Sequence, residues 1–485
     1  MKQLSLLKYA LVFAIITTTV SCSKKFDDSY DIDPNNPSTA TGMQLLANAE
    51  FFLSGTSANT ANQMGVHYPQ YLSLTTYTDN SRYISTNLNF ESWYKGPLKN
   101  IQEVKDKAKN GTLSESEGSA ANQIALANIL ESYFMLHMTD RWGDLPYSDA
   151  LKGSQNRLPK YDTQKEIYTS LFKQLKEASS TLDPNATLKN EIIFNGNMSK
   201  WKKVGNTIRL LMALRLSKVD ATWGKQEFAS ALADGVMTSN ADNFAYPHLA
   251  EKDHENFWYN SFTRLERQWF ALSKPLVDYM KPKNDPRLPI YGDKNQAGEY
   301  VGLEYGKAAG NSGDIPGISL LGAKLRQQNS PVNLVTYPQV LFAMAEAAKL
   351  GWINGGDAVA ETNYKNAIRE SINSWTANAT SASTIDAYIT QPSVAYTAAT
   401  AIQQIAEQRW IHLFLNGYEA WSEWRRTGFP VLMAPAGANG NLIPRREGYP
   451  TQEASNNTVN YNTAVAAFPY GGADGLNARV WWDKP

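Results

Sequence analysis

The sequence predicts a mainly α-helical protein, in which pairs of antiparallel helices form a scaffold that carries long, aromatic-rich loops and insertions. Three observations predict this fold class. Several segments repeat apolar residues at the spacing of a helix. One alanine-rich pair of such segments, residues 339–375, is joined by a Gly-containing turn. Between the periodic segments lie stretches rich in Tyr, Trp, Asn, Gly and Pro, which are typical of loops.

The first 21 residues read as a secretory signal peptide. Lys2 and Lys8 precede an apolar run at 10–16, which is too short to cross a bilayer as a helix, since about 20 apolar residues are needed. A buried first helix or a membrane anchor is the alternative, but the run lacks the polar residues that a buried helix carries at helical spacing. The only cysteine of the chain, Cys22, follows directly.

Cys22 and its neighbours resemble the bacterial lipoprotein box, in which cleavage leaves an acylated cysteine as the new N-terminus. Ser21 supplies the small residue before the cut, and the "SKKFDD" that follows resembles the signal that sends lipoproteins of Bacteroidetes to the outer face of the outer membrane. Several acyl chains together hold a protein firmly on a membrane. We expect a signal peptide at 1–21, a lipid-anchored tether at 22–40 and a single ligand-binding domain at 41–485.

The composition limits which kinds of binding partner are expected. The chain has 46 Lys and Arg and 46 Asp and Glu, and loss of residues 1–21 would leave a net charge of about −2. Such a balance argues against a nucleic-acid partner. The 13 Trp and 25 Tyr exceed what a core commonly uses, because a buried Tyr or Trp needs a partner for its polar tip. We therefore expect exposed aromatic surface that binds a ligand.

Periodic segments predict the helices in order: 43–53, 115–139, 163–182 and 200–219, and then the pair within 339–375. Small residues let the helices of that pair approach closely, as in tetratricopeptide-like hairpins. No strict repeat of about 34 residues recurs elsewhere, so we expect a degenerate helical-repeat scaffold. The stretches 67–94 and 240–335 are non-periodic and aromatic, and the first reads as a ligand-facing loop rather than a packed element.

Two acidic motifs could be interpreted as catalytic, but a structural role explains each of them more simply. In "RWGDLPYSDAL", Gly143 would end a helix and Pro146 prevent its resumption, with Trp142 and Tyr147 packed into the core. The motif's three aspartates then need no acid/base role: Asp140, Asp144 and Asp149.

In "GYEAWSEWRRTGFPV", Glu419 and Glu423 lie near Arg425 and Arg426, which would hold carboxylates ionised and make them poor general acids. Trp421 and Trp424 read as core residues. The five histidines lack the spacing of metal ligands or of a nucleophile's base. We expect no catalytic residue, no metal and no cofactor.

Five stretches in order along the chain resemble one family. They are "DIDPNNPSTATGMQLLANAE", "MTDRWGDLPYSDAL", "KNDPRLPIY", "QRWIHLFLNGYEAWSEWRRTGFPVL" and the terminal "ARVWWDK". Together they are similar to the starch-utilisation-system D lipoproteins (SusD/RagB-like), especially the SusD-like branch 2. The resemblance implies a lipid-anchored helical protein at the cell surface. It also implies a SusC-like TonB-dependent transporter as partner, oligosaccharide or in some members peptide as ligand, and no catalysis.

The ligand-binding candidates come from the aromatic loops. A sugar needs an aromatic plane for its C–H face and planar polar groups around its edge. Residues with those properties cluster in "TTYTDNSRY", "FESWY", "DHENFWYNSF" and "EYVGLEYG": Tyr77, Asp79, Asn80, Arg82, Tyr83, Trp93, Trp258, Tyr259, Tyr300 and Tyr305. Alternatively, these aromatics pin long loops onto the helical body. A lipid-anchored glycoside hydrolase and a scaffold that binds only proteins remain the other hypotheses.

Overall fold

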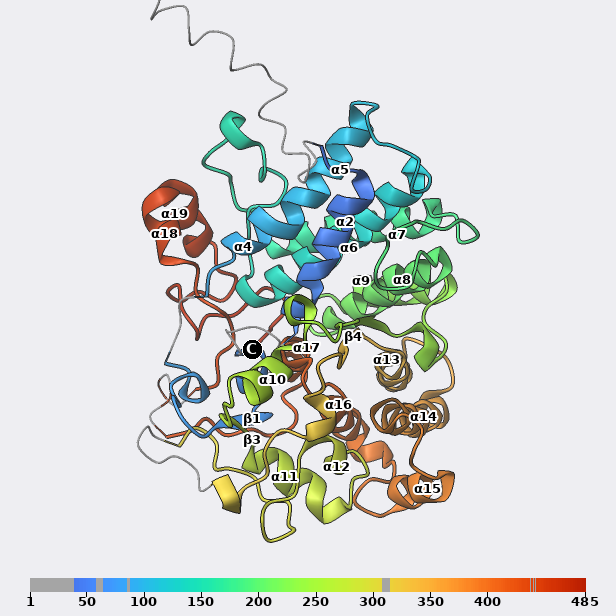
Figure 1. Ribbon diagram of the computed structural model, residues 1–485, viewed down its shortest axis with the longest axis vertical. Coiled ribbons are helices and arrows are strands. Elements are labelled where there is room, and N and C mark those ends of the chain that lie inside the picture. Colours follow the sequence, from blue (N-terminus) through green and yellow to red (C-terminus); the bar gives the residue numbers. More distant parts are fainter. Residues whose placement is uncertain are drawn as a thin grey trace, which may run out of the picture.

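The computed structural model describes residues 39–485 except 58–63, 85–87, 308–314, 437, 439 and 441. The predicted signal peptide, Cys22 and most of the predicted tether lie outside these residues. The described part is mainly helical, with two short antiparallel two-stranded sheets (Figure 1). This confirms the predicted fold class. Among the described helices, none combines the length and apolarity that a membrane-spanning segment needs.

The elements follow one another in two halves of the chain. The first half contains α2 (Gly42–Phe51), α3 (Met64–His67), β1 (Leu72–Leu74), α4 (Glu91–Trp93), α5 (Lys99–Lys109), α6 (Ala120–Trp142), α7 (Gln164–Thr181), α8 (Met198–Arg215), α9 (Ala221–Ala233) and β2 (Phe244–Tyr246). The second half contains α10 (Phe257–Tyr259), β3 (Phe270–Leu272), α11 (Lys274–Met280), α12 (Leu288–Tyr291), β4 (Val332–Val335), α13 (Tyr337–Lys349), α14 (Gly356–Thr376), α15 (Ala382–Thr390), α16 (Ala401–His412), α17 (Gly417–Thr427), α18 (Thr451–Asn456) and α19 (Thr458–Ala466).

Helices α5 to α9 form a stack in which each helix packs against the next or next but one in the chain. Helix α7 begins with a capping box, because Thr163 accepts from the backbone of Glu166 and the Glu166 carboxylate returns to Thr163. A Cβ at Gly205 of α8 would lie 2.6 Å from Ser179 Oγ of α7, so glycine is what allows these two helices to approach so closely. The predicted helices 115–139, 163–182 and 200–219 are confirmed, with shifted ends.

The predicted hairpin 339–375 is confirmed as α13 and α14, which pack closely along their length. Helix α13 contacts α8, α14 and α16, so it joins the stack of α5 to α9 to the helices of the second half of the chain (Figure 1). Its alanines, such as Ala343 and Ala347, are fully buried. Small residues therefore allow neighbouring helices to approach α13 closely on more than one side.

One expectation is wrong, and one long helix, α16, has no counterpart among the predicted segments. Residues 67–75 are not an open loop, because α3, β1 and the tyrosines Tyr68 and Tyr71 are buried. Helix α16 carries no clear periodic signal, because it is buried on several sides and its inward residues include Gln408, Arg409 and His412. A helix that buries hydrogen-bonded polar side chains loses the apolar stripe on which periodicity depends.

Candidate functional site: an exposed aromatic surface

The β1–β3 pair places two loops from distant parts of the chain side by side. Leu72 lies opposite Leu272 and Leu74 opposite Phe270 in an antiparallel register. The pairing continues beyond the strands, because Thr75 N donates to Trp269 O at 2.9 Å and Thr75 Oγ1 donates to Gln268 O at 2.9 Å. The loop after β1 and the loop before β3 therefore leave the sheet together.

Tyr77 and Trp269 meet at this place. Tyr77 is 75% exposed, and its ring centre lies 5.2 Å from that of Trp269 at an interplanar angle of 74°. Arg267 Cζ lies 4.4 Å from the centre of the Trp269 ring. These residues line a shallow cavity of about 190 Å³, together with Leu74, Thr76, Asn80, Phe257, Asn260, Ser261, Leu265 and Phe270. We call this cavity and its rim the aromatic surface.

Backbone geometry turns Tyr77 outward. Its φ of 51° lies in the left-handed region, which is unusual for a bulky residue and is found where the surroundings impose it. The next turn is closed by Arg82, whose guanidinium pairs with Asp79 at 2.6 Å and whose backbone N donates to Asp79 O. Of the predicted candidates, Tyr77 and Asn80 thus line the cavity, while Asp79 and Arg82 form the turn beside it.

The other predicted candidates do not line this cavity. Four of them are buried: Tyr83, Trp93, Trp258 and Tyr305. The hydroxyl groups of Tyr83 and Tyr305 both donate to His67 O, which pins two loops onto α3. Tyr259 and Tyr300 are half-buried, with Arg264 and Lys294 near their rings at 5.7 Å and 5.8 Å.

Sequence reasoning missed Trp269, Arg267 and Leu265. Leu265 is 48% exposed, and all three belong to "RLERQWF" at 264–270, which follows the candidate stretch "DHENFWYNSF" after one intervening residue. An arginine two residues before a tryptophan at the edge of a strand was the available signal. This signal becomes informative only once the β1–β3 register is known, because the register sets this segment beside Tyr77.

Glu255 holds the segment beneath the aromatic surface. It accepts from Asn260 Nδ2 at 2.9 Å, from Arg264 Nε at 2.6 Å and from Gln328 Nε2 at 3.0 Å. Burial would raise the pKa of Glu255, but these hydrogen bonds and the Arg264 charge lower it below its usual range. An ionised Glu255 therefore holds α10 and the π-helical turn Asn260–Arg264 against the loop that contains Gln328.

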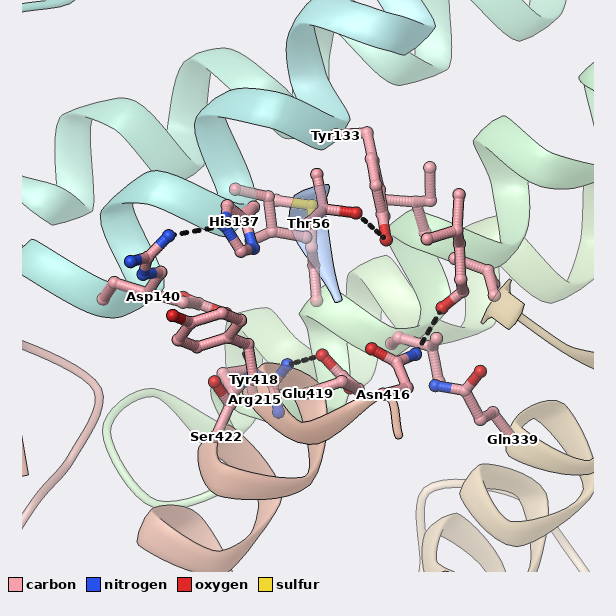
Figure 2. Close-up of a pocket in the computed structure, with 17 residues that line it drawn as sticks. Thr56, Tyr133, His137, Asp140, Arg215, Gln339, Asn416, Tyr418, Glu419 and Ser422 are labelled. Atoms are coloured by element: carbon pink, nitrogen blue, oxygen red, sulfur yellow. Dashed lines mark hydrogen bonds and ion pairs between the residues drawn. The ribbon is translucent and has the colours of Figure 1, made fainter. Parts of the chain in front are cut away.

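A second cavity lies in the core, where α6, α8 and α17 meet (Figure 2). Its volume is about 50 Å³, and its lining includes Tyr133, His137, Asp140, Arg215 and Glu419. The space suits one or a few water molecules and is too small for a sugar. Burial, with the nearby Arg141 charge, lowers the pKa of His137 well below its usual value, so the imidazole here is neutral.

Beside this cavity lies a network of buried ion pairs, which we call the core charge cluster: Arg215, Glu346, Arg409, Glu419, Glu423 and Arg426. Arg426 donates to Glu346 at 2.5 Å and to Glu423 at 2.6 Å, and Arg215 donates to Glu423 at 2.5 Å and to Glu419 at 2.7 Å. The cluster joins α8, α13, α16 and α17.

The expectation that neighbouring arginines hold the two glutamates ionised is confirmed for Glu423 but is wrong for Glu419. Burial would raise the pKa of Glu423, but Arg426, Arg409 and Arg215 hold it far below its usual range. Burial raises the pKa of Glu419 despite its pairing with Arg215. In the described part of the chain, the space that Glu419 borders is the small core cavity, which is too small for a glycan. Among the described residues there is also no group of three or more Asp, Glu, His or Cys that could hold a metal ion.

The motif "RWGDLPYSDAL" is a structural corner, as predicted. Gly143 ends α6 with a φ of 81°, and Trp142 is fully buried, with its indole donating to Gly448 O at 3.0 Å. Asp140 accepts from Tyr168 and Trp482, so its carboxylate is occupied. Tyr147 is half-buried against the core.

Two of three comparisons with known proteins give matches. The family model described as "Starch-binding associating with outer membrane" (SusD-like) matches residues 34–450. No curated protein matches. A solved structure of a chitin-binding protein is 28% identical with a TM-score of 0.79, and the match covers 92% of this chain and 100% of that one.

Two further solved structures have the same fold. A SusD homologue from Bacteroides fragilis is 25% identical with a TM-score of 0.79, over 92% of this chain and 100% of its own. A chitin-binding SusD homologue from Flavobacterium johnsoniae is 24% identical with a TM-score of 0.77, over 91% of this chain and 99% of its own.

Proposed function

Since the chain belongs to the SusD-like family of starch-binding proteins that associate with the outer membrane, we propose that it is a cell-surface lipoprotein that binds oligosaccharide. In this proposal Cys22 carries the lipid, and the bound glycan passes to a SusC-like TonB-dependent transporter in the same membrane. The protein binds its ligand without turnover.

The observation that carries this proposal is the aromatic surface. The exposed Tyr77 ring and the half-buried Trp269 ring line the cavity side by side, and Asn80, Asn260 and Arg267 stand around them. Apolar ring faces beside planar hydrogen-bonding groups are what a sugar requires. The cavity is shallow, so much of a bound sugar would stay hydrated, and we expect modest affinity.

The direct test is calorimetric titration of the mature protein with a glycan panel. Because one similar structure is that of a chitin-binding protein, the panel begins with N-acetylglucosamine oligomers and maltooligosaccharides. Binding supports the proposal if chromatography shows that the glycan is not shortened during the incubation. Turnover would favour a glycoside hydrolase, and binding of peptides alone would favour peptide uptake.

Membrane attachment is tested separately. Cys22→Ala should release the protein from the outer membrane, whereas Ser23→Ala, the matched control, should leave it attached. The unaltered protein should co-purify from native membranes with a large β-barrel transporter. Full attachment of the Cys22→Ala variant would contradict the lipoprotein part of the proposal.

A further inference from the structure

The lining of the aromatic surface carries an unbalanced positive charge. Of the described residues that line its cavity, none is an aspartate or a glutamate, and the charged one is Arg267. Loss of residues 1–21 would leave the whole chain with a net charge of about −2, so the protein as a whole does not attract anions. The positive charge is therefore a local property of this cavity and not part of a basic surface.

Two other arginines beside the aromatic surface have carboxylate partners. Arg82 pairs with Asp79 at 2.6 Å, and Arg264 pairs with Glu255 at 2.6 Å. The guanidinium of Arg267 has neither an ion pair nor a hydrogen bond within the described part of the chain, and its contact there is with an aromatic ring. Its charge and its N–H donors are thus left for a ligand.

Glu266 is the carboxylate next to Arg267 in sequence. It is exposed, it does not line the cavity, and among the described residues it forms no ion pair with Arg267. Exposed charges that are not held in a fixed pair interact weakly through water. Glu266 therefore leaves the charge of Arg267 available, and it provides a control for the experiment below.

The position of Arg267 is fixed from two sides. Its backbone N donates to Ser261 O at 2.9 Å, and the carbonyl oxygens of the two residues that follow accept from Thr75. Its Cζ lies 4.4 Å from the centre of the Trp269 ring, and a cation is attracted to such a ring without using its N–H donors. The guanidinium is therefore positioned before a ligand arrives, which reduces the entropy cost of binding.

The hydrogen-bonding groups of the cavity indicate what kind of sugar suits it. The hydroxyl and amide groups of Tyr77, Asn80 and Ser261 can both donate and accept, so they can meet the hydroxyl groups of any sugar. The guanidinium of Arg267 only donates, through a planar fork of N–H groups. The partner that matches it is a planar group that only accepts, and in a sugar this group is the carboxylate of a uronate.

We propose that the aromatic surface prefers acidic glycans and that Arg267 binds the carboxylate of a uronate unit. The apolar face of the sugar lies against Tyr77 or Trp269, and its carboxylate accepts two parallel hydrogen bonds from the guanidinium. That the ligand is a glycan rests on the proposed function. The preference for a negative charge rests on Arg267 and on the described lining, which contains no carboxylate.

The test compares trigalacturonate with its methyl ester, which has the same sugar chain without the charge. Calorimetry at neutral pH and low ionic strength should show that the unaltered protein binds trigalacturonate at least fivefold more tightly than the ester. Arg267→Gln keeps a planar amide but removes the charge, and it should reduce this preference to less than twofold. Salt at about 0.5 M should weaken binding of the acid more than binding of the ester, because exposed charges are screened.

Two variants serve as controls. Arg157→Gln is the matched one, because Arg157 is also exposed and has no ion pair among the described residues, but it lines a different cavity beside α18. Glu266→Gln removes a charge next to Arg267 without changing the described lining. Both variants should keep the preference for trigalacturonate at fivefold or more.

Two results would overturn the inference. One is equal affinity of the unaltered protein for the acid and the ester, and the other is a preference for the acid that persists in Arg267→Gln. In either case, binding of neutral oligosaccharides that depends on Trp269 would leave the proposed function standing. If neither acidic nor neutral glycans bind to the unaltered protein, the proposed function fails together with the inference.

Discussion

The same contact, an arginine over a tryptophan, occurs in two regions of this molecule with opposite consequences. In the core, Arg425 Cζ lies 3.6 Å from the centre of the Trp421 ring, and both residues are buried. At the aromatic surface, Arg267 Cζ lies 4.4 Å from the centre of the Trp269 ring, and Arg267 is exposed.

Hydrogen bonding separates the two regions. Arg425 donates to Asp140 O, Arg445 O and Ser422 Oγ, so it joins three segments of the protein. Arg267 donates its backbone N to Ser261 O, and no hydrogen bond of its guanidinium to another described residue is found. Its guanidinium remains free for a ligand.

Composition alone therefore does not tell a binding site from a structural one. What distinguishes them is whether the polar groups around the aromatic ring already have partners within the chain. Substitutions should therefore change stability in the core and ligand affinity at the aromatic surface.

The largest effect is expected in the core charge cluster. Glu423→Gln removes the negative charge that three buried arginines share, and breaking a buried ion pair costs about 3–5 kcal/mol. The free energy of unfolding, measured by urea denaturation, should fall by that amount. The exposed ion-pair variant Glu361→Gln, on the surface of α14, should change it by less than about 1 kcal/mol.

Acidification should reduce the effect of Glu423→Gln. The arginines hold the pKa of Glu423 far below its usual range, so its stabilising charge is fully present above the ordinary carboxyl pKa of about 4.3 and is lost as pH falls through the lowered value. The difference between the two proteins should be constant from pH 7 to pH 5 and smaller below about pH 4. A difference that shrinks already at pH 6 would contradict this assignment.

At the aromatic surface, affinity should change instead of stability. Trp269→Ala removes one ring plane and should weaken oligosaccharide binding at least tenfold, which is about 1.4 kcal/mol, as measured by calorimetry. The melting temperature should change little, because Trp269 is half-buried at the edge of the sheet. Large destabilisation with unchanged affinity would make Trp269 a structural residue like Trp421.

The sequence predicted the helical scaffold well where one apolar stripe faces one neighbour. Helix α7 is such a case, with Ile167, Leu171 and Leu175 all buried. It failed for α16, where buried Gln408, Arg409 and His412 take part in hydrogen bonds. Those partners lie on other helices, so the sequence of α16 alone could not reveal that its polar residues point inward.

The candidate site was predicted in part. "TTYTDNSRY" contributed Tyr77 and Asn80, because exposed aromatics beside amides form a local pattern. Trp269 and Arg267 belong to the site because β3 pairs with β1, a strand about 200 residues away in sequence. Burial of Tyr83, Trp93 and Tyr305 depends equally on distant contacts, so their aromatic character alone was a poor guide.

The smallest effect is expected for Arg267→Ala. An exposed cation over an aromatic ring contributes about 0.5–1 kcal/mol, so the free energy of unfolding should change by no more than that. Because the guanidinium lies at the proposed site and has no hydrogen-bond partner among the described residues, oligosaccharide affinity should fall two- to fivefold. Arg267→Lys separates charge from shape, because lysine keeps the charge but loses the planar group that forms paired hydrogen bonds. Affinity lost in Arg267→Lys as fully as in Arg267→Ala would show that the planar group is what the ligand uses, whereas unchanged affinity in both variants would place Arg267 outside the site.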